Sequence, residues 1–278
     1  MRRLAIAAAV IGLTSALTAA APAHASYARS GPYLDYSTRF PLGVHGKIPR
    51  AQYSFGTFDS PVTVAQYGLQ AAANHVVTRR RVYRSDALLA ADWLVRNQAR
   101  DGAWRYDFPF TIRGFAPLKR GWISAMAQGQ AMSLLWRASK LSRRPSYRRA
   151  ALRALRPFAK PVARGGVVAS FDGVPWYEEY PTRPGSFVLN GYLYALLGLY
   201  DVAPWSRGAA RLFDRGFTSL RAQIARFDRP GGSFSMPGLP ASNFYNGVHV
   251  DLLGAIDYVR PSRRLQHYRS RWWTYTLR

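Results

Sequence analysis

Residues 211–227, with the sequence RLFDRGFTSLRAQIARF, carry their large apolar side chains at a regular spacing. Phe213, Phe217, Leu220, Ile224 and Phe227 follow one another at intervals of 4, 3, 4 and 3 residues, which places them on one face of an α-helix. Similar spacing recurs along the chain, whereas the alternation typical of strands is scarce. The sequence therefore predicts an all-α fold with helices near residues 61–76, 86–99, 122–141, 147–160, 189–200 and 248–259 and a weaker one near the C-terminus.

Three turns, each combining glycine with a bulky residue, separate these helices: DGAW at 101–104, GGVV at 165–168 and GGSF at 231–234. Their first glycines lie 63 and then 66 residues apart, and each interval holds two helices. The repeating unit is therefore a helical hairpin, of which the chain holds about four. Repeated hairpins bury their apolar faces against their neighbours. We expect an α/α toroid, an incomplete (α/α)6-type barrel, with an open α-solenoid as the alternative.

The N-terminus has the features of a signal peptide. Arg2 and Arg3 precede an apolar run at 4–20, and Ala23-His24-Ala25 fits the small-x-small pattern before a cleavage site. We expect a secreted chain with no membrane span after cleavage, and a retained N-terminal anchor is the alternative. The expected division of the chain is a signal peptide at 1–25, an N-terminal extension at 26–54 and a helical catalytic domain at 55–278.

Positive charge dominates the composition. Without Arg2 and Arg3, the 39 basic residues become 37 against 14 acidic ones, a net charge of about +23. Such a field favours a polyanionic partner, although a solvated arginine-rich surface is the plainer explanation of runs such as residues 79–81. Export makes nucleic acid an unexpected partner, so an acidic polysaccharide is predicted. The chain has no cysteine, metal-ligand spacing, phosphate loop or dinucleotide motif, and we expect no cofactor and no disulfide. The sequence leaves open whether the chain forms a homodimer.

Four polar motifs stand at equivalent places, at or before the first helix of each hairpin. In a toroid these first helices line the inside, and their N-termini meet at one end, where unpaired N–H groups and the helix dipoles favour anions. A concave mouth of this kind is where a substrate site is expected. The motifs are PVTVAQYGL at 61–69, GWISAMAQGQ at 121–130, WYEEYPTRPGSFVLNGY at 176–192 and NFYNGVHVDLL at 243–253.

Each polar residue of these motifs also has a structural interpretation. The glutamines can serve helix packing, the tyrosines and the histidine can be hydrogen-bonded core residues, and the glutamates can be charge at a helix entry. At one predicted rim, however, the group as a whole favours a functional site. The residues are Gln128, Gln130, Glu178, Glu179, Tyr180, Tyr245 and His249.

The stretch WYEEYPTRPGSFVLNGYLYALLGLYD at 176–201 resembles the signature of the D-glucuronyl C5-epimerase family, in its C-terminal catalytic region. The motifs at 61–69 and 121–130 are similar to the same family in the same order, and the motif at 243–253 is similar more loosely. The resemblance covers roughly residues 55–275. It implies an α/α toroid that inverts C5 of uronic acid residues in heparosan-type glycosaminoglycans, from glucuronate to iduronate. From the resemblance we expect the β-rich N-terminal regions of animal members to be mostly absent here.

The resemblance also implies roles for single residues. Tyr180 matches one catalytic tyrosine, Glu179 its substrate-contacting neighbour and Tyr245 a second catalytic tyrosine. A third family tyrosine and the arginine after it are missing, because Ser235 and its neighbours stand in that segment. A tyrosine base needs positive charge nearby to lower its pKa, and we expect the basic mouth to supply it. The expected substrate contacts are Glu179, Arg183, Asn190, Gln128, Gln130, Asn246 and His249.

Without the third tyrosine, Tyr180 and Tyr245 can still act from opposite faces of the sugar, with Arg183 or Arg229 in place of the lost cation. The alternatives are a polysaccharide lyase, which shares the C5 carbanion, and an inactive carbohydrate-binding relative. A hydrolase built on residues 178–179 needs a second carboxylate across the bond and is less favoured. The carboxylates available as that partner are Asp172 and Asp251.

Overall fold

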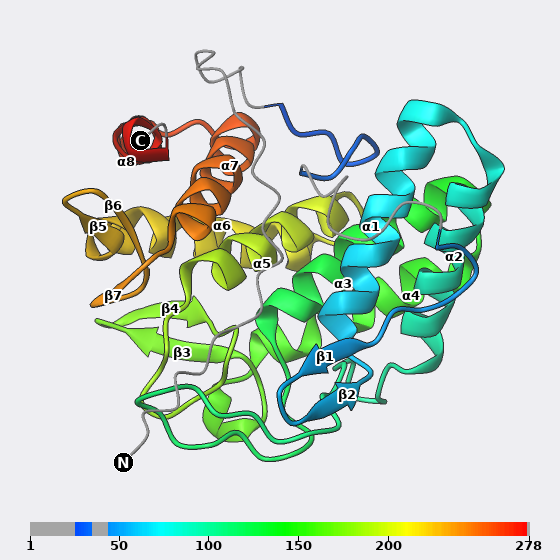
Figure 1. Cartoon of the computed structure of the whole chain (residues 1–278), viewed down its shortest axis with the longest axis horizontal. Coiled ribbons are helices and arrows are strands. Elements are labelled where there is room, and N and C mark those ends of the chain that lie inside the picture. Colours follow the sequence, from blue (N-terminus) through cyan, green and yellow to red (C-terminus); the bar gives the residue numbers. More distant parts are fainter. Residues whose placement is uncertain (1–25, 35–43, 277–278) are drawn as a thin grey trace.

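The computed structural model describes residues 26–34 and 44–276, so the predicted signal peptide lies outside the described residues. Within these ranges eight α-helices follow one another as four hairpins (Figure 1). The predicted helical fold is therefore confirmed. The helices are α1 (Pro61–Thr78), α2 (Arg81–Arg96), α3 (Ala125–Ser142), α4 (Pro145–Arg153), α5 (Leu189–Val202), α6 (Arg207–Gln223), α7 (Asn243–Val259) and α8 (Arg263–Thr276).

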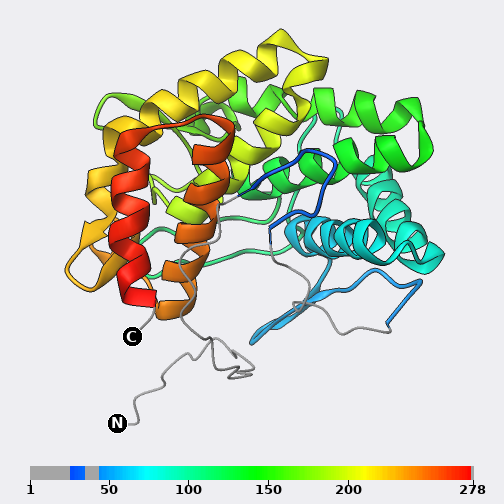
Figure 2. The same cartoon turned by 90° about the horizontal axis from the view of Figure 1, so that it is seen from above.

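The first helices of the four hairpins form an inner row. α1 packs on α3, α3 on α5 and α5 on α7, and each is accompanied by the second helix of its own hairpin. Seen from above, the hairpins follow an arc from α1–α2 to α7–α8 (Figure 2). The connections that lead into the inner helices therefore gather at one end of the molecule.

These connections contain short antiparallel strands, which the helical periodicity does not predict. They form two hairpins and one three-stranded sheet, with strand pairs β1–β2 and β3–β4 and the order β5-β6-β7. The strands are β1 (Ala51–Tyr53), β2 (Gly56–Phe58), β3 (Val168–Phe171), β4 (Val174–Tyr177), β5 (Asp228–Arg229), β6 (Gly232–Met236) and β7 (Leu239–Pro240).

Several helix boundaries differ from the predicted ones, and two of the differences have clear local reasons. α4 ends at Arg153 and not near residue 160, because Pro157 cannot continue a helix and its ring would meet the carbonyl of residue 153. α7 begins at Asn243 and not at residue 248, because the Ser242 hydroxyl caps it by accepting the N–H of Tyr245 at 3.4 Å. The earlier start places Tyr245 in the first turn of α7.

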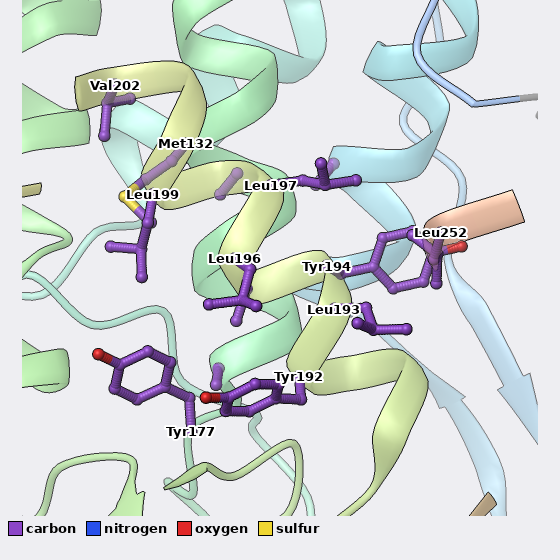
Figure 3. Close-up of a cluster of buried hydrophobic side chains, with 14 of the residues drawn as sticks. Met132, Tyr177, Tyr192, Leu193, Tyr194, Leu196, Leu197, Leu199, Val202 and Leu252 are labelled. Atoms are coloured by element: carbon purple, nitrogen blue, oxygen red, sulfur yellow. The ribbon is translucent and has the colours of Figure 1, made fainter. Parts of the chain in front are cut away.

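The core lies around the crossing of α3 and α5, where the two backbones touch. A Cβ on Gly198 would lie 2.1 Å from the carbonyl oxygen of Gly129, so glycine is required at this crossing. α5 is covered on nearly all sides and buries 13 of its residues. Its apolar side chains meet those of α3, β4 and α7 (Figure 3). Among them are Met132, Tyr177, Tyr192, Leu193, Leu196, Leu199 and Leu252.

Residues 26–34 pack against the C-terminal ends of α3 and α5. Arg137 and Asp201 form a buried ion pair there, with 2.9 Å between Nη1 and Oδ2. The Tyr27 hydroxyl donates to the same carboxylate oxygen at 2.7 Å, and Arg137 donates to the carbonyls of Ala28 and Gly31. This segment therefore belongs to the core of the helical domain. The predicted boundary at residue 54 falls in the turn between β1 and β2.

Candidate functional site

The segment after β4 crosses the N-termini of α3 and α5. The N–H of Ala125 donates to the carbonyl of Glu178 at 2.9 Å, which fixes the segment to α3. The next residue, Glu179, accepts the N–H of Gly191 in the first turn of α5 and the Asn190 side-chain amide at 3.4 Å. A Cβ on Gly191 would lie 2.3 Å from Glu179 Oε2, so only glycine leaves room for the carboxylate. Glu179 therefore caps α5, and Asn190 holds it in place.

Glu179 is a buried residue, only 8% exposed. Burial raises its pKa to about 7, against the lowering effect of hydrogen bonds from the Tyr180 hydroxyl and the Gly191 amide. A carboxyl group in this condition can take up and release a proton near neutral pH.

Tyr180 lies directly beside this carboxylate. Its ring stacks on Phe110 at 5.5 Å and lies 5.8 Å from Trp122, and its hydroxyl donates to Glu179. Burial, then the charge of Glu179 and the hydrogen bond to it, raise the pKa of Tyr180 well above its ordinary value. We expected positive charge near Tyr180 to lower its pKa, and this expectation is wrong. At neutral pH Tyr180 keeps its proton and acts as a donor.

Tyr245 reaches the same place from α7. It is 44% exposed and lies close enough to Tyr180 for its charge to influence the pKa of that residue. The structure thus brings together Glu179, Tyr180 and Tyr245 from the start of α5 and the start of α7.

Beside Tyr180 the structure has an aromatic wall that the sequence did not predict. Its residues are Tyr106, Phe108, Phe110 and Trp122. Trp122 stacks on Tyr106 at 3.8 Å with nearly parallel rings and on Phe110 at 5.8 Å. Phe110 in turn carries Tyr180, and Phe108 packs the wall against β1 and β2. The signal for it is the density of aromatic residues between 104 and 122, in a stretch without helical period. Aromatic surfaces of this kind suit the C–H faces of sugar rings.

Gln128 and Gln130 of α3 were predicted to contact substrate, but the structure buries both of them. Gln128 is fully buried and accepts the N–H of Trp104 at 2.9 Å. Its amide donates to the carbonyls of Gly102 and Ala154, so it fastens the 101–104 turn to the end of α4. Gln130 is also fully buried inside the helix row. Their role is therefore in packing.

Asn246 and His249 were also predicted to contact substrate, and the structure buries both of them as well. Asn246 accepts the Ser233 hydroxyl at 2.8 Å and donates to the carbonyl of Trp272 at 3.0 Å, which ties α7 to β6 and α8. His249 is fully buried, with Nδ1 2.8 Å from the Ser233 hydroxyl. Because that hydroxyl donates to Asn246, the neutral His249 ring is the donor to Ser233. Both side chains therefore lie where α7 packs against β6 and α8.

Burial of His249 makes the stability of the fold depend on pH. Burial lowers the pKa of this histidine to about 3 from 6.5, so the unfolded chain binds the proton first as the pH falls. This contribution is fully present above pH 6.5 and is lost progressively toward pH 3. We expect the free energy of unfolding to fall by about 2–3 kcal/mol from this residue between pH 7 and 4.5.

Urea unfolding at the two pH values checks this expectation. His249→Gln should flatten the loss, while His267→Gln, at an exposed position of α8, should leave it as in the wild type. An unchanged pH dependence in His249→Gln would contradict the assignment.

Three arginines could take the place of the family arginine that is missing near Ser235. Arg183 is exposed on the loop that follows Tyr180. Arg229 lies over the ring of Phe234 at 5.9 Å. Arg113, which was not predicted, lines a groove of about 310 Å³ together with Phe187 and the turn 236–239. Ser235 precedes this turn on β6, so the segment that departs from the family pattern forms one side of the groove.

The carboxylates considered for a hydrolase lie in different surroundings. Glu178 is fully buried and accepts hydrogen bonds from Ser186 and Phe187. Asp172 lies exposed in the β3–β4 turn, 3.7 Å from Arg226, and Asp251 is exposed on α7. Within the described ranges no group of three or more metal-ligating side chains occurs, and no helix is long and apolar enough to cross a membrane.

Comparisons with known proteins identify the family of this chain. The family model described as D-glucuronyl C5-epimerase C-terminus matches residues 97–274. A D-glucuronyl C5-epimerase of Caenorhabditis elegans is 37% identical over 221 residues, which cover 70% of this chain and 36% of that protein. An uncharacterized protein of Methanocaldococcus jannaschii is 26% identical over 137 residues, 47% of this chain and 44% of that protein. The chain thus spans less than half the length of these relatives.

Proposed function

Because this chain belongs to the D-glucuronyl C5-epimerase family, we propose that it inverts C5 of uronic acid residues within an acidic polysaccharide. A heparosan-like polymer, in which D-glucuronate becomes L-iduronate, is the substrate that the resemblance favours. The predicted signal peptide and the charge of the chain support action on such a polymer outside the cell. The observation that carries the proposal is the pairing of a neutral-range carboxyl group, Glu179, with Tyr180 and Tyr245.

Inversion begins with removal of the C5 proton, which lies next to the substrate carboxylate. Tyr180 is unsuited to this step, because its pKa is raised well above the ordinary value. Glu179, with a pKa of about 7, is the better base. We therefore assign the proton abstraction to the Glu179 carboxylate and leave the electron pair of the C5–H bond delocalised into the substrate carboxylate. Tyr180 donates to Glu179 and fixes its orientation.

Inversion ends when a proton reaches C5 from the opposite face. Tyr245 stands on a different helix and is exposed to water. Its hydroxyl gives the proton, and the phenolate regains one from solvent. The proton on Glu179 returns to solvent, so the enzyme is restored and the substrate has exchanged its C5 hydrogen.

The substrate carboxylate carries extra negative charge during this step, and groups at the mouth must stabilise it. The exposed Arg183 is the first candidate, with Arg113 in the adjoining groove. The N-termini of α3, α5 and α7 are capped by Ser124, Glu179 and Ser242. The aromatic wall formed by Trp122 and Phe110 supports the sugar ring. We infer that the arc of hairpins is a section of an α/α toroid whose mouth holds these groups.

Incubation of the purified chain with heparosan and other uronans in deuterated water tests the proposal. Deuterium should appear at C5, together with iduronate. An unsaturated product that absorbs in the ultraviolet would instead identify a lyase. Salt-sensitive binding without any exchange across the panel would identify a carbohydrate-binding relative and refute the epimerase.

A further inference from the structure

Glu178 is a buried acid whose function is unassigned by the mechanism above. Its side chain is fully buried at the end of β4. The carboxylate accepts the Ser186 hydroxyl at 2.7 Å and the N–H of Phe187 at 3.1 and 3.2 Å to its two oxygens. The backbone N–H of Ser186 donates to it as well. In the described part of the chain, the groups that shift its pKa include no cation.

The loop 180–187 is wrapped around this carboxylate. Phe187 adopts φ +53°, in the left-handed region that a phenylalanine rarely occupies. Its N–H bond to Glu178 and the stacking of its ring on Phe171 at 4.1 Å hold it there. A Cβ on Gly185 would lie 2.7 Å from Glu178 Oε1. The conformation of the loop therefore depends on an acceptor at this point.

The loop connects Glu178 directly to Tyr180. The Ser186 hydroxyl lies 2.7 Å from Glu178 Oε2 and 3.1 Å from the backbone carbonyl of Tyr180. The backbone of Glu178 is itself fixed at both sides, because its N–H donates to Val167 at 2.7 Å and its carbonyl accepts from Ala125. The carboxylate thus forms the centre of a rigid support beneath the tyrosine.

Ionisation of this group has a physical cost. Burial raises the pKa of Glu178 to about 7, although its hydrogen bonds lower it. A neutral glutamine has a single acceptor oxygen and would turn an N–H₂ group toward the donors of Ser186 and Phe187. In its ionised form, Glu178 therefore fits this set of donors as no neutral side chain of the same length does.

We propose that Glu178 is a positioning residue, whose carboxylate holds the loop 180–187 so that the Tyr180 hydroxyl stays aligned with Glu179 and the aromatic wall. This inference rests on the proposed function of Tyr180 and Glu179. Disturbing the loop should reduce turnover much more than substrate binding, because misplacement of a proton-transfer group by about 1 Å costs on the order of 100-fold in rate.

The test compares Glu178→Gln and Ser186→Ala with a matched control. Ser219→Ala removes an equally buried hydroxyl on α6, which donates to the carbonyl of Arg215 at 3.2 Å. We expect kcat for C5 exchange to fall about 100-fold in Glu178→Gln and about tenfold in Ser186→Ala, with KM within about twofold. Ser219→Ala should keep the wild-type kcat, with a change in Tm similar to that of Ser186→Ala.

Amide hydrogen exchange of the peptide covering the loop gives a second readout that does not depend on activity. Protection should fall about tenfold in Glu178→Gln and Ser186→Ala and stay unchanged in Ser219→Ala. If the wild type exchanges no uronan, the proposed function fails, and the loop protection alone decides whether Glu178 holds the loop. Wild-type kcat and wild-type protection in both variants would overturn the inference, and Ser186→Ala decides it if Glu178→Gln does not fold.

Discussion

Replacing Glu179 with glutamine is expected to reduce C5 exchange by at least about 10³-fold. Glutamine keeps the length of the side chain and can accept the N–H of Gly191, but it cannot accept the proton from C5. Substrate binding should persist, because the aromatic wall is untouched and glutamine still accepts the N–H of Gly191 at the start of α5. Deuterium incorporation and uronan binding measured on the same preparation check both parts. Retention of more than a tenth of the wild-type rate would exclude Glu179 as the base.

The same variant should be more stable than the wild type at alkaline pH. Glu179 has a raised pKa in the folded chain, about 7 against 4.5, so the unfolded chain loses its proton first as the pH rises. Stability is therefore lost between pH 4.5 and 7, by up to about 3 kcal/mol. Glutamine removes this loss. The gain should be present in urea unfolding at pH 8 and nearly absent at pH 5, and a variant that is less stable at pH 8 would contradict the burial argument.

Phenylalanine at the two tyrosines should separate their roles. Tyr245→Phe removes the proton donor of the opposite face, and exchange should fall by about 10²- to 10³-fold at every pH. Tyr180→Phe removes a hydrogen bond that lowers the pKa of Glu179, so less of the base is ionised at neutral pH. Its rate should fall about 100-fold at pH 7 and recover partly as the pH rises.

Rate profiles from pH 5 to 9 measure this difference, with Tyr258→Phe as the control. Tyr258 is exposed at the far end of α7, and its substitution should leave the profile unchanged. Parallel profiles for Tyr180→Phe and Tyr245→Phe would show that the two tyrosines act alike and would refute the division of roles.

The helices were predictable because their buried side chains recur with the helical period, as on the one buried face of the outer helix α6. Their ends were less predictable, since the stop of α4 depends on Pro157 and the start of α7 on Ser242. A proline or a serine acts as a boundary only in the right local context.

The site was predictable only in part. Glu179 and Tyr180 do lie before the inner helix α5, and Tyr245 lies in the first turn of α7, while their roles stay predictions. Gln128 and His249 also occur near helix starts, but their partners come from other segments, such as Trp104 and Ser233. The spacing of residues within one helix carries no information about such partners. The aromatic wall of residues 106–122 escaped the prediction because its stacking is created by the path of a connection without a repeat.

The contact of residues 26–34 with the ends of α3 and α5 has a consequence for the order of folding. Tyr27 and Asp201 are 174 residues apart in the chain, so the carboxylate that receives this tyrosine is made long after the tyrosine itself. Hairpins α1–α2 and α3–α4, whose contacts are local, can assemble earlier. We expect docking of the N-terminal segment to be a late step, and a contact formed after the transition state slows unfolding without speeding folding. We therefore expect the contacts of residues 26–34 to slow unfolding more than they speed folding.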